Sequence, residues 1–382
     1  MRRPTTSGVR RPATVLALLL VVVLVLPPLL STYWIDVLTA VAIYSVVALG
    51  LNLLMGRVGL VSLGQIAVLA LGGWVAAKLA FATSIPFPLV LLIAGLITLV
   101  LGTLVGLPAL RLSGLYLALI TLMLAGAITV VLSTTNFPNG GPGFLSHTES
   151  SFGNPAVRRP DFASSDAAYL RFTVIVAALM FALAFWHVRS RPGRAWAAIR
   201  QSEPAALAAG VNLTLYKLWA WALASFMTGV AGALLAGSVG KLYTYQFPTR
   251  DSIILLAVVL MGGIYSLWGA VVAGALIKLL PALLDDWGLP ADLLIILFGV
   301  GVLQVLLTAP GGLAAQVPKD LARMRGALSA VVRHPAPGPA APGLRSGAAP
   351  SGPRSGDGAS EGREATRTER APTGPAPQEP AQ

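Results

Sequence analysis

Long apolar segments alternate with short polar stretches from the N-terminal region to about residue 308. Most of these segments hold about the 20 residues that an α-helix needs to cross the hydrocarbon core of a bilayer. The pattern predicts an all-α polytopic membrane protein, because helices satisfy their own backbone hydrogen bonds in lipid. The apolar segments fall near residues 13–32, 37–55, 59–80, 87–110, 113–132, 167–186, 218–240, 252–265, 267–284 and 291–308.

The segments 252–265 and 267–284 decide the number of crossings, since the pair Gly262-Gly263 interrupts them. They form either two short elements or one long tilted helix that is broken at the glycines. With ten crossings and a cytoplasmic N-terminus, most loop and tail Lys and Arg residues fall on the inner side, as cytoplasmic loops prefer. If these two segments formed a single span and nothing else changed, the basic C-terminal tail would lie on the outer side of the membrane. We therefore expect an even number of transmembrane helices, ten or eight, with both termini in the cytoplasm.

The two ends of the chain differ from its centre. Residues 1–36 combine a basic leader with an apolar run, but no small-x-small cleavage site follows Leu30, so we expect an uncleaved first span. The main membrane domain is expected over 37–310, and a cytoplasmic juxtamembrane segment over 311–334. Residues 335–382 are rich in Pro, Ala and Gly and poor in large apolar side chains. Such a tail buries too little surface to offset its ordering entropy and is predicted to be disordered.

Composition strengthens the membrane assignment and narrows the chemistry. Hydrophobic residues make up 55% of the chain and charged residues 11%, with a mean hydropathy of +0.77. A soluble protein carries about 25% charged residues. There is no cysteine, and the three histidines lack metal-ligand spacing, so neither a metal nor a cofactor is expected. The net charge of +12 lies mainly in loops and tails, which indicates contact with anionic membrane lipid rather than nucleic acid.

The distribution of acids argues against two classes of membrane protein. No Asp or Glu occurs between Val37 and Thr148. An ion-driven secondary carrier usually buries an acid at mid-membrane, although backbone carbonyls can also bind sodium, so this alternative stays open. No embedded-enzyme motif is present, and Gly237–Lys241 lacks the full spacing of a phosphate loop. The chain is therefore expected to be neither an enzyme nor an ATPase, and no catalytic residue is assigned.

The stretch 52–65 concentrates the neutral polar residues of the apolar segments. Three glycines and several polar side chains weaken a regular helix there, and broken membrane helices line cavities or lie buried in protein. Asn and Gln in lipid need partners, so each such residue either bonds a neighbouring helix or faces a wet pathway. Residues 261–267 faintly echo 55–63, a hint of an internal repeat. The candidates for the translocation pathway are Asn52, Gly59, Ser62, Gly64, Gln65 and Ser266.

The segment 189–217 is polar and basic and lies between two long apolar runs. Ser202 is expected to cap a short helix that begins at Glu203-Pro204, where proline and an acid suit the first turn. Gly210 is expected to end that helix. A short helix with small side chains fits a groove of a soluble partner. The alternative is an amphipathic linker on the membrane surface.

The pattern Glu203-x-Ala205-Ala206-x-x-x-Gly210 resembles the coupling-helix motif of ABC-importer permeases, in the form found in the branched-chain amino-acid permease family. The resemblance covers roughly residues 37–310, is closest to the LivM type of subunit, and makes 37–310 a permease domain. Pro204 and the long tail depart from the family pattern. The other stretches that are similar to the family are 51–56, 59–65, 193–200, 210–217, 229–234 and 260–263.

The resemblance implies partners and a mechanism. An extracytoplasmic substrate-binding protein would deliver the ligand to a pore formed with a LivH-like permease in the bacterial plasma membrane. Two ATP-binding subunits, LivG- and LivF-like, would hold the cytoplasmic helices and drive alternating access. The coupling helix would then comprise Arg200, Glu203, Ala205, Ala206 and Gly210, with Arg200 and Glu203 as polar contacts to an ATPase. The alternatives are an ABC permease for urea or short amides and, from another class, a secondary carrier.

Overall fold

The computed structural model describes residues 27–109, 112, 114–134, 157, 159–288, 296–301 and 303. Within these residues every regular element is helical, in agreement with the predicted all-α class. The elements are η1 (Pro27–Leu29), α2 (Thr32–Asn52), η2 (Leu53–Val58), α3 (Gln65–Ala82), α4 (Phe87–Ala109), α5 (Gly114–Thr134), η3 (Asp161–Ala163), α6 (Asp166–Arg189), α7 (Arg191–Gln201), α8 (Glu203–Ala208), α9 (Leu213–Val239), η4 (Thr244–Gln246), α10 (Asp251–Gly262) and α11 (Leu267–Asp286).

Six of the described helical stretches are long and apolar enough to cross a membrane. The predicted segment 13–32 lies mostly outside the described residues, as does much of 291–308, and 311–334 and 335–382 lie wholly outside them. The count of ten or eight crossings and the disordered tail therefore stay predictions. The candidate spans are Thr32–Val58, Phe87–Leu107, Gly114–Thr134, Asp166–Arg189, Leu213–Val239 and Leu267–Asp286.

The region around Gly262-Gly263 forms two packed elements rather than one long helix. α10 ends at Gly262, and Gly263 takes a φ of 109°, a backbone conformation that glycine adopts easily. α11 then begins at Leu267 and packs back against α10. The 12 residues of α10 rise only about 18 Å, so α10 is too short to cross the bilayer core alone.

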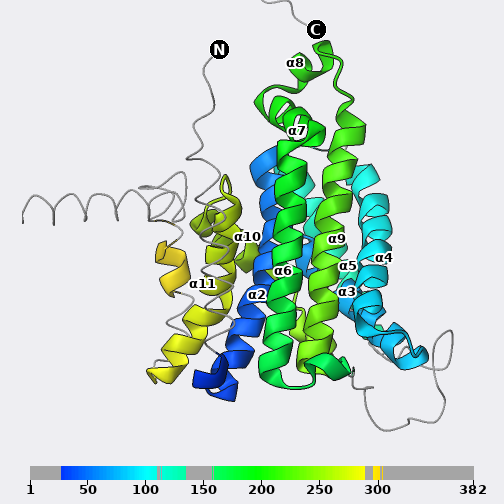
Figure 1. Cartoon of the computed structure of the whole chain (residues 1–382). Coiled ribbons are helices and arrows are strands. Elements are labelled where there is room, and N and C mark those ends of the chain that lie inside the picture. The colour runs from blue at the N-terminus through cyan, green and yellow to red at the C-terminus, as the bar shows by residue number, and fades with distance from the viewer. Residues whose placement is uncertain are drawn as a thin grey trace, which may run out of the picture. The chain divides into compact units, whose positions relative to one another are not determined.

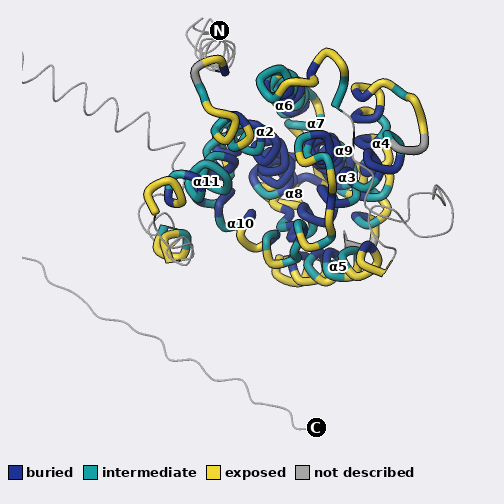
Figure 2. The backbone as a smooth tube through the Cα atoms, turned by 90° about the horizontal axis from the view of Figure 1, so that it is seen from below, coloured by how far each residue is buried: buried dark blue, intermediate teal, exposed yellow. Residues whose placement is uncertain are grey.

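Two helices form the centre of the bundle. α9 packs against α4, α3 and α2, and α2 packs against α11 and α6 as well. Figure 1 shows α2, α6 and α9 running side by side, with α4 on one flank and α10 and α11 on the other. The tube in Figure 2 is mostly dark blue along α2 and α9 and carries much more yellow along α5. The outward faces of the flanking helices are thus left for lipid or for another subunit.

Small residues let α9 approach its neighbours closely. A Cβ added to Gly72 of α3 would lie 2.6 Å from the Cα of Gly229, and a Cβ on Gly229 would overlap the side chain of Thr98 of α4. Such backbone contact without intervening side chains is a common way for membrane helices to associate. It fixes the α3–α4–α9 crossing on which the start of α3 depends.

Candidate functional site

The stretch 52–65 interrupts the first described span, as the sequence predicted. α2 passes into the π-helical turn η2, and the chain leaves η2 at Gly59 with a φ of 88°. The amides of Gly59 and Leu60 both donate to the carbonyl of Leu54, and α3 begins only at Gln65. A Cβ on Gly56 would overlap the carbonyl of Ile264. The interruption therefore lies directly against the α10–α11 turn, and we call residues 52–65 and 262–266 together the helix-break junction.

Asn52 binds the two halves of the helix-break junction. Its side chain is fully buried, and Nδ2 donates to the carbonyls of Gly263 (3.2 Å) and Ser266 (2.9 Å). Its Oδ1 has no hydrogen-bond partner. The structure thus brings together Asn52 and Ser266, two predicted pathway residues from distant parts of the chain. Within this chain the Asn52 amide joins the two helix interruptions, and its role in the pathway stays a prediction.

The other predicted pathway residues hold the beginning of α3. Ser62 is fully buried, and its Oγ accepts from the amide of Gly64 (3.4 Å). Gln65 Oε1 accepts from Thr228 Oγ1 of α9 (2.8 Å). The amide between these positions, that of Leu63, donates to Thr121 Oγ1 of α5 (2.9 Å). The Gln65–Thr228 and Leu63–Thr121 bonds join α3 and the chain before it to α9 and α5, whereas the Ser62–Gly64 bond is local, and the pathway role of Ser62 and Gln65 stays a prediction.

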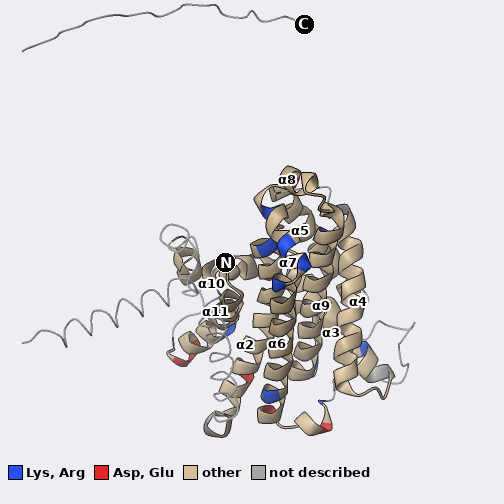
Figure 3. Ribbon diagram, turned by 45° about the horizontal axis from the view of Figure 1, so that its top comes forward, with Lys and Arg blue, Asp and Glu red and all other residues tan. Residues whose placement is uncertain are grey.

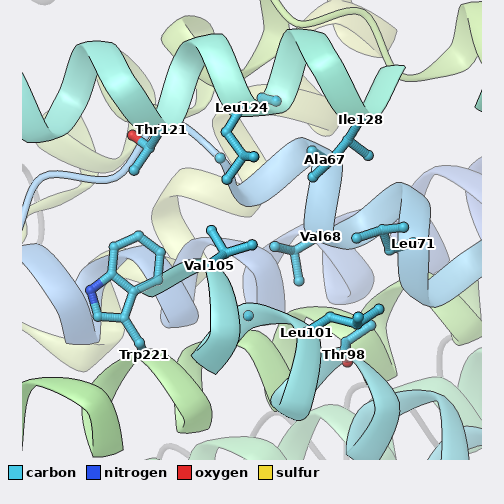
Figure 4. Close-up of a pocket in the computed structure, with 13 residues that line it drawn as sticks. Ala67, Val68, Leu71, Thr98, Leu101, Val105, Thr121, Leu124, Ile128 and Trp221 are labelled. Atoms are coloured by element: carbon cyan, nitrogen blue, oxygen red, sulfur yellow. The ribbon is translucent and has the colours of Figure 1, made fainter. Parts of the chain in front are cut away.

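A mostly apolar pocket lies between α3, α4, α5 and α9 (Figure 4). It has about 30 Å³ of room for a water-sized molecule, which suits a water or two and is far too small for an amino acid. Of the predicted pathway residues, only Gly64 lines it. The side chains that Figure 4 labels around it are Ala67, Val68, Leu71, Thr98, Leu101, Val105, Thr121, Leu124, Ile128 and Trp221.

The segment 189–217 folds into the compact pair α7 and α8 at one end of the bundle (Figure 1). Trp196 of α7 is fully buried, and its Nε1 donates to the carbonyl of Tyr216 in α9 (2.8 Å). Ala195 and Ile199 share this buried face at helical spacing. The indole anchors α7 to the first turns of α9, a role that the sequence analysis did not assign to Trp196.

α8 starts and ends where the sequence predicted. The Ser202 side chain accepts from the amide of Ala205 (3.4 Å), and Pro204 lies in the first turn. Gly210 takes a φ of 78° just after the helix, and the amide of Val211 returns to the carbonyl of Ala206. Ala206 itself is buried, so within the chain it packs against the neighbouring residues of this segment.

The charged residues of the predicted coupling motif are engaged within the chain. Glu203 forms an ion pair with Lys217 (Oε1 to Nζ, 2.7 Å). Arg200 Nη1 donates to the carbonyl of Gly56 (2.7 Å), and its guanidinium lies 4.3 Å from the centre of the Tyr265 ring. Arg200 thus reaches both halves of the helix-break junction, while Glu203 steadies α8. The contacts of Arg200 with Gly56 and Tyr265 were not predicted, because these residues are remote in sequence. The ion pair of Glu203 with Lys217 was not predicted either.

The outer face of α8 presents Leu207, whose side chain is 57% exposed. Ala205 and Gly210 are also exposed. Leu207 was not among the residues predicted from the sequence, because the motif consists of small and charged positions. Leu207 therefore gives α8 an apolar outer surface that the rest of the described chain does not cover.

Comparison with known proteins decides the family. The model of the family described as "Branched-chain amino acid transport system / permease component" matches residues 33–306. The chain belongs to this family. Its match covers both halves of the helix-break junction and all of α7 and α8, so the branched-chain permease prediction is confirmed.

Two curated relatives of this permease are named "High-affinity branched-chain amino acid transport system permease protein LivM". The protein of Salmonella typhimurium is 30% identical over 287 residues, which cover 70% of this chain and 68% of the relative. That of Escherichia coli is 28% identical over 330 residues, which cover 82% of this chain and 77% of the relative. No solved structure matches the permease. Its relatives are transport subunits rather than enzymes, and its apolar helices make it an integral membrane protein.

Proposed function

We propose that this permease is one of two pore-forming subunits of an ATP-driven importer for branched-chain amino acids. A homologous, LivH-like permease would complete the pore, and LivG- and LivF-like ATPases would bind the end that carries α7 and α8. A secreted binding protein would deliver the substrate at the opposite end. The names of the two LivM relatives support the substrate class, since both describe a high-affinity branched-chain amino acid system.

The anchoring of α8 is the observation that carries the coupling role. A helix that passes force from an ATPase must move as a unit with the permease, without bending at its own ends. Here the Ser202 cap, the Glu203–Lys217 ion pair and the burial of Ala206 hold six helical residues in one orientation. Its exposed surface, centred on Leu207, is left free for the ATPase groove.

Arg200 supplies a direct route from the coupling region to the pore. It lies on α7, three residues before α8, and bonds the carbonyl of Gly56 in η2 while stacking on Tyr265 of the α10–α11 turn. A movement of α7 would therefore displace η2 and the α10–α11 turn together. We propose that closing of two ATPases moves α7 and thereby displaces the helix-break junction, which opens or closes the inner end of the pathway.

The pathway residues act in this proposal mainly as hinges and braces. The Asn52 amide and the Gln65–Thr228 bond keep the broken helices in register, and Gly59 permits the turn between them. The apolar surface of α3, α4 and α5 that lines the pocket next to Gly64 suits an aliphatic side chain once these helices separate. No buried charge lines that pocket, which fits a substrate recognised by its apolar side chain.

The test is uptake of radiolabelled leucine, with urea in parallel, into vesicles that hold this permease and its four partner subunits. Leu207→Glu should abolish ATP-dependent leucine uptake, because a carboxylate cannot enter an apolar groove without losing its hydration. Leu207→Met is the matched control and should retain most uptake, since it keeps the volume and the apolar character.

Each component of the proposal has an outcome that contradicts it. Urea uptake without leucine uptake would move the substrate class to short amides. Leucine uptake that persists without the ATPases would make the permease a secondary carrier. Full uptake by Leu207→Glu, with ATPase binding intact, would remove α8 from the coupling role.

A further inference from the structure

A basic pocket of about 520 Å³ lies between η2, the end of α6 and α7, separate from the apolar pocket of Figure 4. Arg57 comes to it from η2, and Arg194 and Arg200 come from α7. None of the residues that line it is acidic. Figure 3 shows the blue of Lys and Arg gathered around α7, whereas the bundle below is mostly tan.

The arginines of this pocket have more N–H donors than their contacts within the described chain use. A guanidinium carries five N–H donors. Arg200 uses one of them on the carbonyl of Gly56, and the Nε of Arg57 is buried without any hydrogen-bond partner. Within the described chain, the three arginines of this pocket form no ion pair with any acid. The three positive charges around this cavity repel each other. An anion bound between them would reduce this repulsion and would accept a hydrogen bond from the Nε of Arg57.

Arginine donors that line one pocket suit the oxygens of a phosphate group. Guanidinium groups bind phosphate through paired N–H···O contacts, and the weak hydration of arginine favours such binding in partly buried places. The pocket also adjoins the end of α6, where Trp186 is 66% exposed, as expected for an aromatic residue at a membrane surface. Basic pockets between transmembrane helices on the cytoplasmic side are known to receive anionic lipid headgroups.

We propose that this pocket binds a phosphate group, supplied in the membrane by the headgroup of an anionic phospholipid. A phosphate held between Arg57 and Arg194 would join η2 to α7. These are the two elements that the Arg200–Gly56 bond already connects. Anionic lipid would then be a structural ligand of the route between α8 and the helix-break junction. This effect on transport rests on the proposed function, whereas the binding does not.

The binding test uses the assembled transporter in nanodiscs of neutral phosphatidylcholine, titrated with fluorescent phosphatidylglycerol. Arg57→Gln and Arg194→Gln should each weaken binding at least about tenfold, the factor for loss of one charge-assisted hydrogen bond to a phosphate oxygen. Arg191→Gln is the matched control: it removes the same charge from α7, but residue 191 does not line the pocket. It should change binding less than about fivefold, because it loses only the general attraction of one basic residue to an anionic surface, which salt reduces further.

Equal loss of binding in all three variants would refute phosphate binding in this pocket, because general attraction to the basic end of the protein would then explain the binding. Equal binding of labelled phosphatidylcholine by the wild type would overturn it as well. Competition by millimolar inorganic phosphate would support the phosphate site and assign it to a soluble ligand instead of a lipid. Phosphatidylglycerol that binds the lone permease and is displaced by the ATPases would overturn the proposal in favour of an acidic side chain of a partner.

A transport measurement then separates this inference from the proposed function. Replacing neutral lipid with phosphatidylglycerol should raise leucine uptake by the wild type and by Arg191→Gln, and should leave Arg194→Gln unchanged. Uptake in neutral lipid that is present but insensitive to phosphatidylglycerol would refute the lipid effect while leaving the importer intact. No uptake in any lipid, with headgroup binding intact, would refute the importer and leave the pocket.

Discussion

Replacement of Asn52 by alanine should destabilise the permease and not merely impair transport. The change removes two hydrogen bonds, to the carbonyls of Gly263 and Ser266, from a fully buried side chain. Interhelical hydrogen bonds in membranes contribute about 0.6 kcal/mol on average and up to about 1.7 kcal/mol each. Two such bonds give a loss of roughly 1 to 3 kcal/mol in the free energy of unfolding. Loss of the brace should also reduce uptake.

The measurement is unfolding of the purified permease in mixed micelles by increasing SDS, alongside leucine uptake by the complex. Thr173→Val is the matched control, because the Thr173 hydroxyl is equally buried but has no hydrogen-bond partner. Its removal should change stability by less than about 0.5 kcal/mol, since no bond is lost. Asn52→Asp should be worse than Asn52→Ala, because a carboxylate would face two carbonyl oxygens. An Asn52→Ala protein that is as stable as Thr173→Val but transports nothing would refute the brace and make Asn52 a substrate contact.

Three further substitutions, with Gly126→Ala as a control, test the packing that positions the site. Trp196→Phe should cost about 1 kcal/mol through loss of one buried hydrogen bond, and should increase cleavage after Arg194 and Arg200 of α7 in a timed trypsin digest. Gly229→Leu should prevent a monodisperse protein in size-exclusion chromatography, because its side chain would overlap Thr98 and the α3 backbone. Gly59→Ala should lower stability by about 1 to 2 kcal/mol because φ is 88° there. Gly126→Ala, a helical position with open space around it, should leave the thermal midpoint unchanged or raise it.

Local signals in the sequence predicted the elements well. The apolar runs gave the long helices, and the Ser202 cap and Gly210 gave both ends of α8. The glycines between 56 and 64 predicted the interruption before α3, since their effect on a helix is local. The prediction was weakest for α10, where hydropathy did not distinguish a short separate helix from part of a longer span. The turn at Gly263, and not hydropathy, sets the length of this helix.

The site could be predicted only where its residues are close in sequence. Arg200 looked like an outward contact because nothing nearby shows that its guanidinium reaches Gly56 and Tyr265. Glu203 was chosen for the same role, and its ion pair with Lys217 on the next helix was not predicted. Hydrophobic periodicity says which face of a helix is buried, but it does not say which polar groups meet across the bundle.

The bonds of Asn52 also set an order for biosynthesis. Its nearer partner is 211 residues further along the chain. At ribosomal rates of about 5 to 20 residues per second, that partner emerges roughly 10 to 40 s later. During this interval the newly inserted α2 carries an amide without its final acceptors, inside or beside the insertion machinery. A nascent chain stalled before residue 263 should therefore be more sensitive to membrane quality-control proteases than one stalled after α11, even though both contain the described helices from α2 to α9.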